Sequence, residues 1–388
     1  MARILMLVAT AVANDSRVRR EAEALVAAGH NVHIIGKDVP EDFVPPLGIT
    51  VSSVGATSPF RSTSGAGRQG LLVRAARWWL LPRHRNASFR SWAQRAIVDA
   101  KSRDFDVVHA HDFTALQAGA ELASERGVPY VYDSHEIWLQ QDRQFRPTPW
   151  QDRRERQIEG SLGSGAAAVI TVGEGVAQAL TAAYGWSHVI VVRNTFPVAA
   201  GSGQLPQVPR ALVYAGRIDG QRDLLTVLAT VRQLPDLPVR LIGPVDESWH
   251  ARHRAEFSAA KVTVVPALPL VAVTAELQQA GLALVTLGAG PENHSQAMPN
   301  KLFHAVQAGV PVIASDLPEL ARVVNHYGLG ELYRSGDVAD LIAAVRRAQA
   351  RYPELVANVK AAQSELSWSA DSAVLVACYE RIGLGTFD

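Results

Sequence analysis

The sequence predicts an α/β protein built from two doubly wound domains with parallel sheets. Three observations lead to this prediction: a length of 388 residues, an alternation of short apolar runs with helical patterns, and a break in that alternation near residue 200. At about 150 residues per domain, this length suits two or three domains. Runs of four to six apolar residues without polar alternation are typical of strands buried on both faces, as in a parallel sheet.

The first half of the chain contains a series of such runs, which we interpret as strands. They span Arg3–Val8, Asn31–Gly36, Ile49–Val54, Asp106–Ala110, Pro129–Tyr132, Ala168–Val172 and His188–Val192. Between the first two, residues 16–28 place apolar side chains at helical spacing, and Gly29 is expected to end this helix. A strand, a helix and a strand make the βαβ unit, and its repetition predicts a doubly wound sheet.

The first strand overlaps a stretch that also fits a secretory signal peptide. Residues 1–13 combine one arginine with an apolar run and small residues. An amphipathic helix and a new strand follow directly, so we interpret the stretch as a buried strand. No stretch approaches the ~18 consecutive apolar residues of a membrane span. We therefore expect a cytoplasmic protein, with association at the inner face of the membrane as one alternative.

The second half begins after residues 196–210, which mix Pro, Gly, Ser and Gln without periodicity and are interpreted as a linker. The later apolar runs are Ala211–Ala215, Val239–Gly243, Val262–Val265, Leu282–Thr286 and Val310–Ala314, and the chain is predicted to be helical from about Ala339. We expect domains over 1–195 and 211–366, and a helix over 367–388 that crosses back to the N-terminal domain. Two such domains imply a cleft, with ligands at the carboxyl ends of strands.

The overall composition excludes several classes of protein. The chain has 38 basic and 37 acidic residues, a formal net charge of +1. A basic field over the whole protein, of the kind that drives nonspecific nucleic-acid binding, is therefore excluded. Cys378 is the single cysteine, which excludes an intramolecular disulfide and a thiolate metal cluster.

Two arginines follow the first strand of the second domain. Gly216 allows a sharp turn at the strand end, and Arg217 and Arg222 are five residues apart, so their guanidinium groups can converge on one anion. Asp223 is positioned to cap the next helix. The alternative is an ordinary turn with two solvated arginines.

A glycine-rich loop leads into a later helix. Residues 287–304 read LGAGPENHSQAMPNKLFH, and Pro299 suits the first position of a helix. A helix N-terminus presents free N–H donors and a partial positive charge, which favours phosphate. Lys301 lies at this end, in a chain with only five lysines against 33 arginines. The alternative is a surface lysine in an ordinary first turn.

Polar clusters follow two strands of the first domain. They are His109-Ala-His111-Asp112 and Asp133-Ser-His135-Glu136. The first places both histidines on one face of a strand, but zinc needs at least three ligands and no third is evident, so we predict no metal site. These groups either line a cleft or form hydrogen bonds within the core.

Positive charge is concentrated between Asp42 and Asp99, where the sequence has no acidic residue and eight arginines. Trp78, Trp79 and Trp92 are interleaved with them. Arginine with tryptophan on a helix suits an anionic membrane surface, so residues 61–95 are a candidate for peripheral membrane contact or for binding an anionic acceptor. The alternative is a helix with a solvated face whose tryptophans pack inward.

Taken together, these motifs resemble those of the family-4, group 1 glycosyltransferases of GT-B fold, over nearly the full length. The matching stretches, in order, are NDSRVRREAEALVAAGHNV, DVVHAHD, VYDSHE, RNTFPV, YAGRIDGQRDL, AMPNKLFHAVQAGVPVIASDLPEL and LSWSADSAVLVACYERI. The resemblance implies two Rossmann-like domains facing a central cleft. It also implies transfer of a sugar from a nucleotide-diphosphate sugar, of UDP or GDP, to the hydroxyl of a glycan, lipid-linked or small-molecule acceptor, with retention of configuration and without metal or cofactor.

The resemblance also assigns roles to residues. Arg217, Arg222 and Lys301 would hold the diphosphate, and His135 would face the donor sugar. The remaining donor-binding residues would be Gly216, Val265, Pro266, Leu268, Ser295, Gln296, Pro299, Asn300 and His304. The acceptor side would include Asn14, Ser16, Arg17, His111, Asp112 and Glu136.

The sequence departs from the family pattern at one motif. The family has two glutamates eight residues apart, and Gln296 and His304 stand at these positions. A carboxylate accepts two ribose hydroxyl protons, whereas a neutral imidazole offers one acceptor and one donor. A noncatalytic homologue that serves as a binding or scaffolding subunit, and a nucleotide-sugar epimerase, are therefore alternatives. A nicotinamide dehydrogenase is disfavoured, because the loop after the first strand reads ATAVANDS and lacks GxGxxG.

Overall fold

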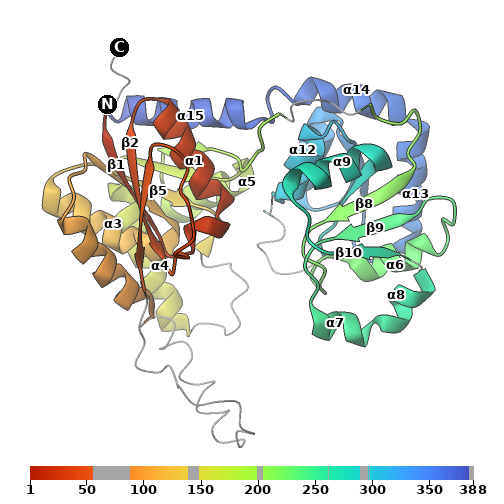
Figure 1. The fold of residues 1–388 in the computed structure, drawn as a ribbon, viewed down its shortest axis with the longest axis horizontal. Coiled ribbons are helices and arrows are strands. Elements are labelled where there is room, and N and C mark those ends of the chain that lie inside the picture. The colour runs from red at the N-terminus through yellow and green to blue at the C-terminus, as the bar shows by residue number, and fades with distance from the viewer. Residues whose placement is uncertain are drawn as a thin grey trace, which may run out of the picture. The chain divides into compact units, whose positions relative to one another are not determined.

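The fold is described from a computed structural model, which covers residues 1–55, 88–138, 148–198, 204–260, 262–288, 296 and 298–383. Contacts within the chain define two compact units. The first unit comprises Met1–Val172, Val176–Val192 and Ser372–Asp388, and the second comprises Gly173–Gly175 and Arg193–Asp371. Each unit is an α/β fold with one sheet, and helices lie on both faces of that sheet (Figure 1).

The first unit contains a sheet of seven parallel strands in the order β3-β2-β1-β4-β5-β6-β7. The strands are β1 (Arg3–Val8), β2 (Asn31–Lys37), β3 (Ile49–Val54), β4 (Val107–His111), β5 (Tyr130–Ser134), β6 (Ala168–Thr171) and β7 (Val189–Val191). The helices are α1 (Ser16–Ala27), α3 (Asp112–Arg126), α4 (Pro149–Gly165) and α5 (Glu174–Tyr184), with a 3-10 turn over Val12–Asn14 and a further helix over residues 88–101.

The second unit contains six parallel strands in the order β10-β9-β8-β11-β12-β13. The strands are β8 (Ala211–Ala215), β9 (Val239–Ile242), β10 (Thr263–Val265), β11 (Gly281–Val285), β12 (Val312–Ser315) and β13 (Gly330–Tyr333). The helices are α6 (Leu224–Val231), α7 (Glu247–Arg252), α8 (Arg254–Ala260), α9 (Leu270–Ala280), α11 (Asn300–Gln307), α12 (Pro318–Tyr327), α13 (Val338–Ala350) and α14 (Tyr352–Ala362). The unit boundary falls inside a last helix, α15 (Trp368–Arg381).

These elements confirm the predicted doubly wound α/β class. In both sheets the first strand of the unit lies inside the sheet, with the next two strands on one side of it and the later strands on the other. The direction in which strands are added therefore reverses between β1 and β4 and between β8 and β11. Every predicted strand is present, with ends that differ from the prediction by at most two residues. The first strand is β1, which is buried at five of its six positions. Ligands of such sheets bind at the carboxyl ends of the strands near this reversal.

Two local predictions need correction. Pro299 is the N-cap of α11, and the first helical residue is Asn300. Asp223 is the N-cap of α6, but its side chain makes no capping bond and its backbone is left-handed, with φ of 53°. Its carboxylate instead accepts hydrogen bonds from Tyr333 Oη at 2.8 Å and Gly336 N at 3.1 Å. These bonds tie the start of α6 to the end of β13.

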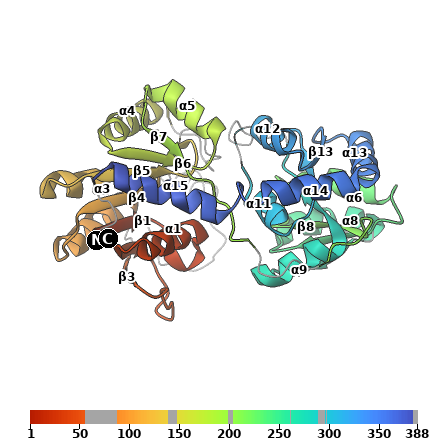
Figure 2. The same cartoon turned by 90° about the horizontal axis from the view of Figure 1, so that it is seen from above.

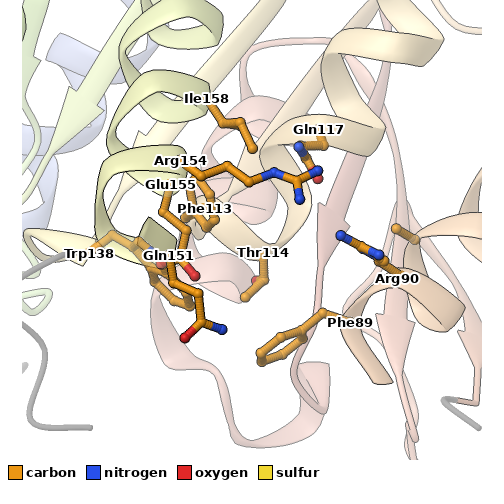
Figure 3. A pocket seen from close by; sticks show the side chains of 11 residues that line it. Phe89, Arg90, Phe113, Thr114, Gln117, Trp138, Gln151, Arg154, Glu155 and Ile158 are labelled. Atoms are coloured by element: carbon orange, nitrogen blue, oxygen red, sulfur yellow. Dashed lines mark hydrogen bonds between the residues drawn. The ribbon is translucent and has the colours of Figure 1, made fainter. Parts of the chain in front are cut away.

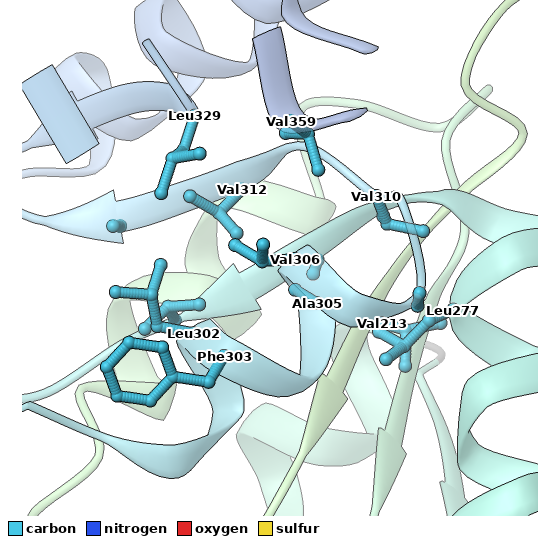
Figure 4. Close-up of a cluster of buried hydrophobic side chains, with 14 of the residues drawn as sticks. Val213, Leu277, Leu302, Phe303, Ala305, Val306, Val310, Val312, Leu329 and Val359 are labelled. Carbon is cyan, nitrogen blue, oxygen red and sulfur yellow. The ribbon is translucent and has the colours of Figure 1, made fainter. Parts of the chain in front are cut away.

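Apolar side chains form the core on both faces of each sheet. In the second unit, Leu302, Phe303 and Val306 of α11 pack between β11, β12 and α14, and this anchors α11 against the sheet (Figure 4). Helix α14 also contacts α12 and α13 (Figure 2). Burial of one such side chain stabilises a fold by about 1.5–3 kcal/mol. The position of α11 is therefore well determined by its apolar face.

The predicted membrane stretch is largely outside the described residues, because 56–87 are among those not described. Trp92 is described and is fully buried in the core of the first unit, packed with residues of β4 and α3. The prediction that Trp92 faces a membrane is therefore wrong, and the inward-packing alternative holds for it. Among the described helices, none is both long and apolar enough to cross a bilayer.

Candidate functional site

In the second unit, two loops approach each other closely at the carboxyl ends of β8 and β9. Gly216 follows β8 and Gly243 follows β9, and Gly216 N donates to Ile242 O at 2.9 Å. A Cβ atom on Gly243 would lie 2.1 Å from Gly216 O, so only glycine fits there. This close contact fixes the loop that carries Arg217 and Arg222.

Both arginines of this loop lie beside one carboxylate. Arg217 Nε is 3.4 Å from Asp219 Oδ2, and Arg222 Nε is 3.6 Å from Asp219 Oδ1. The side chain of Arg217 is 62% exposed, whereas that of Arg222 is 29% exposed. Arg222 Nε is buried without a hydrogen-bond partner among the described residues. Asp219 therefore holds two guanidinium groups together while neutralising only one of their charges.

Lys301 reaches the same place from the first turn of α11. Its Nζ atom donates to Tyr214 Oη and to Thr286 O, both at 3.2 Å, and lies 4.3 Å from the centroid of the Tyr214 ring. Burial, together with the charge of Arg222, lowers the pKa of Lys301 to about 7. Thr286 Oγ1 in turn donates to Arg222 O at 2.7 Å. Three basic side chains from two segments thus meet at one end of the sheet.

The N-terminus of α11 adds to this positive region. No side chain among the described residues caps the helix. Leu302 N donates to Pro299 O at 2.9 Å, and the N–H groups before it have no acceptor within the helix. Asn300 Oδ1 accepts a hydrogen bond from Asn194 Nδ2 at 3.0 Å. A helix N-terminus carries a partial positive charge, which favours an anion in front of it.

His304 lies one turn further along α11 and is nearly buried. Its ring stacks on Phe196, with the ring centroids 5.3 Å apart, and its Nε2 atom is 2.9 Å from Thr274 Oγ1. Thr274 Oγ1 donates its own proton to Leu270 O at 3.0 Å, so His304 Nε2 is the donor in their shared bond. Burial lowers the pKa of His304 to about 4, so the ring is neutral at pH 7 with Nδ1 as an acceptor.

The other predicted donor-binding residues lie in several different parts of the chain. Val265 and Leu268 pack against the same apolar cluster as Leu302, and Pro266 between them is exposed. Gln296 lies against the backbone of Gly175, where a Cβ atom would come within 2.1 Å of Gln296 Oε1. Ser295 lies outside the described residues. Their part in donor binding stays a prediction.

In the first unit, His135 follows β5 and lies between two carboxylates. His135 Nε2 is 2.9 Å from Asp133 Oδ2, and His135 Nδ1 is 3.4 Å from Asp112 Oδ2. Burial alone would lower the pKa of His135, but Asp112 and Asp133 together raise it to about 10. The ring is therefore an imidazolium at pH 7 and remains partly exposed.

Asp133 is the centre of a larger buried network. Arg17 donates to both of its oxygens, from Nε at 2.9 Å and from Nη2 at 2.8 Å, and His111 Nδ1 lies 3.1 Å from Oδ2. Arg17 Nη2 also pairs with Glu21 Oε1 at 2.9 Å. Although burial would raise the pKa of Asp133, Arg17 and His135 hold it well below its usual range. Asp133 is therefore ionised and orients His135.

The two strand histidines belong to the core. His109 and His111 are fully buried, and their rings stack with centroids 4.3 Å apart. His109 Nδ1 is 2.8 Å from Tyr379 Oη of α15, and burial lowers its pKa well below the usual value. Of the two alternatives, lining a cleft or forming hydrogen bonds within the core, the second therefore holds for both histidines.

The predicted acceptor-side residues separate into two groups. Arg17 and His111 are buried in this network, where both contact Asp133. Ser16 begins α1 and is partly exposed, Asp112 begins α3, and the side chain of Glu136 is exposed. Asn14 ends the 3-10 turn before α1.

The network also supplies a ligand set that the sequence did not reveal. Glu21, His109, His111 and Asp133 each offer one ligand atom, all within 4.8 Å of one another. Arg17 already pairs with both carboxylates, however, and supplies the positive charge that a cation would bring. The arrangement thus suits a charge-neutralising guanidinium better than a divalent ion.

Sequence reasoning missed Glu21 and Asp219, and it named Asp133 only as a member of a polar cluster without a role of its own. A usable signal existed for each: Glu21 lies on the apolar face of α1 one turn after Arg17, and Asp133 lies two residues before His135 in a strand. Asp219 lies between the two arginines in the same loop. Charged residues at otherwise buried positions are seldom without a partner.

Comparisons with known proteins agree with this architecture. The family model described as glycosyl transferase 4-like domain matches residues 15–195, and that described as glycosyl transferases group 1 matches residues 209–350. A phosphatidyl-myo-inositol mannosyltransferase of Mycobacterium leprae is 22% identical over 95% of this chain and 92% of its own length. A glycogen synthase of Mycobacterium tuberculosis is 25% identical over 62% of this chain, and the match spans 59% of that relative's length.

Solved structures of two proteins share the fold. Sucrose-phosphate synthase from Thermosynechococcus elongatus has a TM-score of 0.70 at 16% identity, over 99% of both chains. Anabaena HepE in complex with UDP-glucose has a TM-score of 0.69 at 14% identity, over 98% of this chain and 100% of its own. The two family models together match most of both α/β units, and the chain belongs to the group 1, family-4 glycosyltransferases of GT-B fold.

Proposed function

We propose that the protein transfers a sugar from a nucleotide-diphosphate sugar to the hydroxyl group of an acceptor. The observation that carries the proposal is the meeting of Arg217, Arg222 and Lys301 at the carboxyl end of the second sheet, with Asp219 as a carboxylate that pairs with both arginines. A site with excess positive charge beside a helix N-terminus suits a diphosphate. Family membership supports the same assignment.

In this proposal the three cations act mainly on the leaving group. Negative charge grows on the diphosphate oxygen as the bond to the anomeric carbon breaks. Cationic groups held in advance by the protein therefore stabilise the transition state more than the ground state. Bound diphosphate would also raise the pKa of Lys301 from its value of about 7, so that the lysine carries a full charge in the complex.

His135 would act from the first unit. Its imidazolium, whose two N–H groups lie beside Asp112 and Asp133, would supply positive charge next to the donor sugar and the departing oxygen. Closure of the two domains over the donor would bring this group to the sugar and exclude water, which limits hydrolysis. Retention of configuration and independence of metal are further parts of the proposal.

The donor is proposed to be a UDP- or GDP-sugar. Anabaena HepE, which shares the fold, was solved with UDP and with UDP-glucose. His304 would accept a hydrogen bond from a single ribose hydroxyl through Nδ1, because Nε2 is already bonded to Thr274. Val265, Pro266 and Leu268 would lie against the base.

The direct test is turnover of donor sugars by the purified protein. UDP- and GDP-sugars are offered with and without acceptor mixtures, and release of the nucleotide is measured. For the donor that is turned over, Arg222→Ala and Lys301→Ala are each expected to lower the rate by about 10²–10³. Arg232→Ala is the matched control, since Arg232 is an exposed arginine of the same unit at the end of α6.

Two results would refute the proposal. One is near-parental rates for Arg222→Ala and Lys301→Ala at saturating donor, with thermal unfolding unchanged. The other is the absence of both hydrolysis and transfer for every donor, together with no stabilisation by UDP or GDP, which would favour the noncatalytic alternative. Ligands that bind the native state alone raise its unfolding temperature, so a thermal-shift assay separates weak activity from absent binding.

A further inference from the structure

We propose that a pocket in the first unit binds the acceptor, and that the acceptor is an amphiphile with an anionic group attached to an apolar chain or ring. The inference rests on the proposed transfer function and specifies the substrate that receives the sugar. The pocket has a volume of about 450 Å³ and is formed by the helix over 88–101, the start of α3 and the first turns of α4 (Figure 3). All of its lining residues belong to one unit.

The floor of the pocket is apolar and aromatic. Phe113 and Trp138 stack with their ring centroids 4.9 Å apart, and Phe89 and Ile158 continue this surface (Figure 3). Trp138 Nε1 donates to Glu155 Oε2 at 2.7 Å, which fixes the indole ring. Glu155 is thereby engaged with Trp138 at this edge of the pocket. An apolar body fits such a floor because it packs against the aromatic and aliphatic side chains and is itself removed from water.

Two arginines give the pocket its charge. Arg90 and Arg154 are both exposed, and their side chains extend toward one another from two different helices (Figure 3). Neither makes an ion pair with a carboxylate within the described part of the chain. Two guanidinium groups facing one another repel unless an anion lies between them. Arginine binds phosphate and carboxylate through paired N–H donors, so an anionic group is the natural partner.

The pocket adjoins the residues that hold His135. Asp112, which pairs with His135, is followed directly in α3 by Phe113 and Thr114, both of which line the pocket. Trp138 comes three residues after His135. The N-terminal end of α3 is therefore shared by the pocket and by Asp112, the carboxylate that pairs with His135. Gln117 and Gln151 add neutral polar groups to the rim.

The test measures binding of defined probes by isothermal titration calorimetry. Phenyl phosphate and farnesyl phosphate carry both the anion and an apolar body, whereas inorganic phosphate and benzyl alcohol carry only one of the two. We expect the two amphiphilic phosphates, or one of them, to bind at least about tenfold more tightly than inorganic phosphate or benzyl alcohol. Preference for the farnesyl compound would indicate a lipid phosphate, and preference for the phenyl compound a water-soluble acceptor.

Variants test the two arginines. Arg90→Gln combined with Arg154→Gln is expected to weaken binding of the preferred probe by about tenfold or more, because charge-assisted hydrogen bonds are lost. Arg153→Gln is the matched control, since Arg153 is the preceding residue of α4, is exposed and does not line the pocket. It should leave the affinity unchanged. Phe89→Ala is expected to weaken the amphiphilic probes and not inorganic phosphate.

The outcomes separate this inference from the proposed function. UDP or GDP binding, measured in the same proteins, should not change in any pocket variant, because the donor residues lie in the second unit. Equal affinities for inorganic phosphate and both amphiphiles would overturn the pocket assignment. So would a loss of probe affinity in Arg153→Gln as large as that in the Arg90→Gln and Arg154→Gln double variant. Neither result would affect the transfer proposal. Failure of the wild-type protein to bind any nucleoside diphosphate would instead refute the proposed function.

Discussion

Lys301 is the residue whose charge state should change when a nucleotide binds. Its pKa is about 7, because burial and Arg222 disfavour the charged form. A diphosphate would raise that pKa, so binding between pH 7.5 and 9 should take up a proton. The dissociation constant for UDP or GDP should then rise with pH, by up to about tenfold per unit.

Calorimetry in buffers of different ionisation enthalpy measures this proton directly. Lys301→Arg is the informative variant, because arginine stays charged throughout the range and should remove both the proton uptake and the pH dependence. His304 and His135 titrate near pH 4 and pH 10 and contribute little in this window. Undiminished proton uptake in Lys301→Arg would show that another group titrates.

His304 should contact one ribose hydroxyl. Its Nε2 atom is hydrogen-bonded to Thr274 Oγ1, which leaves Nδ1 as the single acceptor of the ring. His304→Ala should weaken binding of the preferred nucleoside diphosphate by about two- to tenfold, the range of one neutral hydrogen bond. One of the two deoxy nucleotides, 2′ or 3′, should lose affinity in the wild-type protein and show no further loss in the variant. If the loss of affinity caused by His304→Ala and the loss caused by the deoxy nucleotide are additive, His304 does not contact the ribose.

Residue types at strand ends could be predicted from the sequence, but their partners could not. Arg217, Arg222 and Lys301 follow elements whose ends converge in any doubly wound sheet. Asp219 was missed, since one sequence does not show which acidic side chain turns toward two arginines. Glu21 was missed for a related reason: its exposure depends on the packing of α1 against the sheet, which buries it completely.

At the scale of elements, the buried network of Arg17, Glu21, Asp133 and the two strand histidines joins α1 to β4 and β5. Arg17→Met should lower the free energy of unfolding by about 3–5 kcal/mol, because it removes the guanidinium that pairs with both buried acidic side chains, Glu21 and Asp133. Lys101→Met is the control, since Lys101 pairs with Glu125 at the surface of the same unit and should cost less than about 1 kcal/mol.

The pH dependence of the stability lost in Arg17→Met provides a second test of the electrostatic role of Arg17. In the wild-type protein the pKa of Asp133 lies well below its usual value, so its stabilising effect is present at neutral pH and is lost as pH falls. In Arg17→Met, burial is no longer offset by the guanidinium and raises the pKa of Asp133. Protonation of this carboxyl group as pH falls therefore makes the variant less unstable relative to the wild-type protein. Chemical denaturation at several pH values should therefore show that the difference in free energy of unfolding between the wild-type protein and Arg17→Met becomes smaller toward pH 4. A difference that stays constant would contradict the electrostatic explanation.

The strands were predictable from sequence because nearly all of them are continuous apolar runs. The exception is β13, which sequence reasoning missed. It has four residues, and Glu331 within it pairs with Arg347 and Arg351 at 2.7 Å each. A short strand at the edge of a sheet with a charged residue does not stand out from a loop.

At the scale of the whole molecule, the proposed reaction needs only the protein, the sugar donor and the acceptor, without a metal ion. In the proposed mechanism, Arg217, Arg222 and Lys301 supply at the diphosphate the positive charge that a metal ion would otherwise bring. Treatment with EDTA followed by dialysis should leave the rate of donor turnover within about twofold of the untreated rate. A loss restored by Mg²⁺, Mn²⁺ or Zn²⁺ would contradict metal independence.

The central claim is that the second unit holds a diphosphate between the loop after β8 and the N-terminus of α11. The most direct measurement is a crystal structure of the protein with the nucleoside diphosphate that stabilises it most. The account predicts phosphate oxygens within hydrogen-bond distance of Arg217, Arg222 and Lys301, with the ribose beside His304. A nucleotide bound elsewhere, with these side chains still paired only to Asp219, Tyr214 and Thr286, would contradict it.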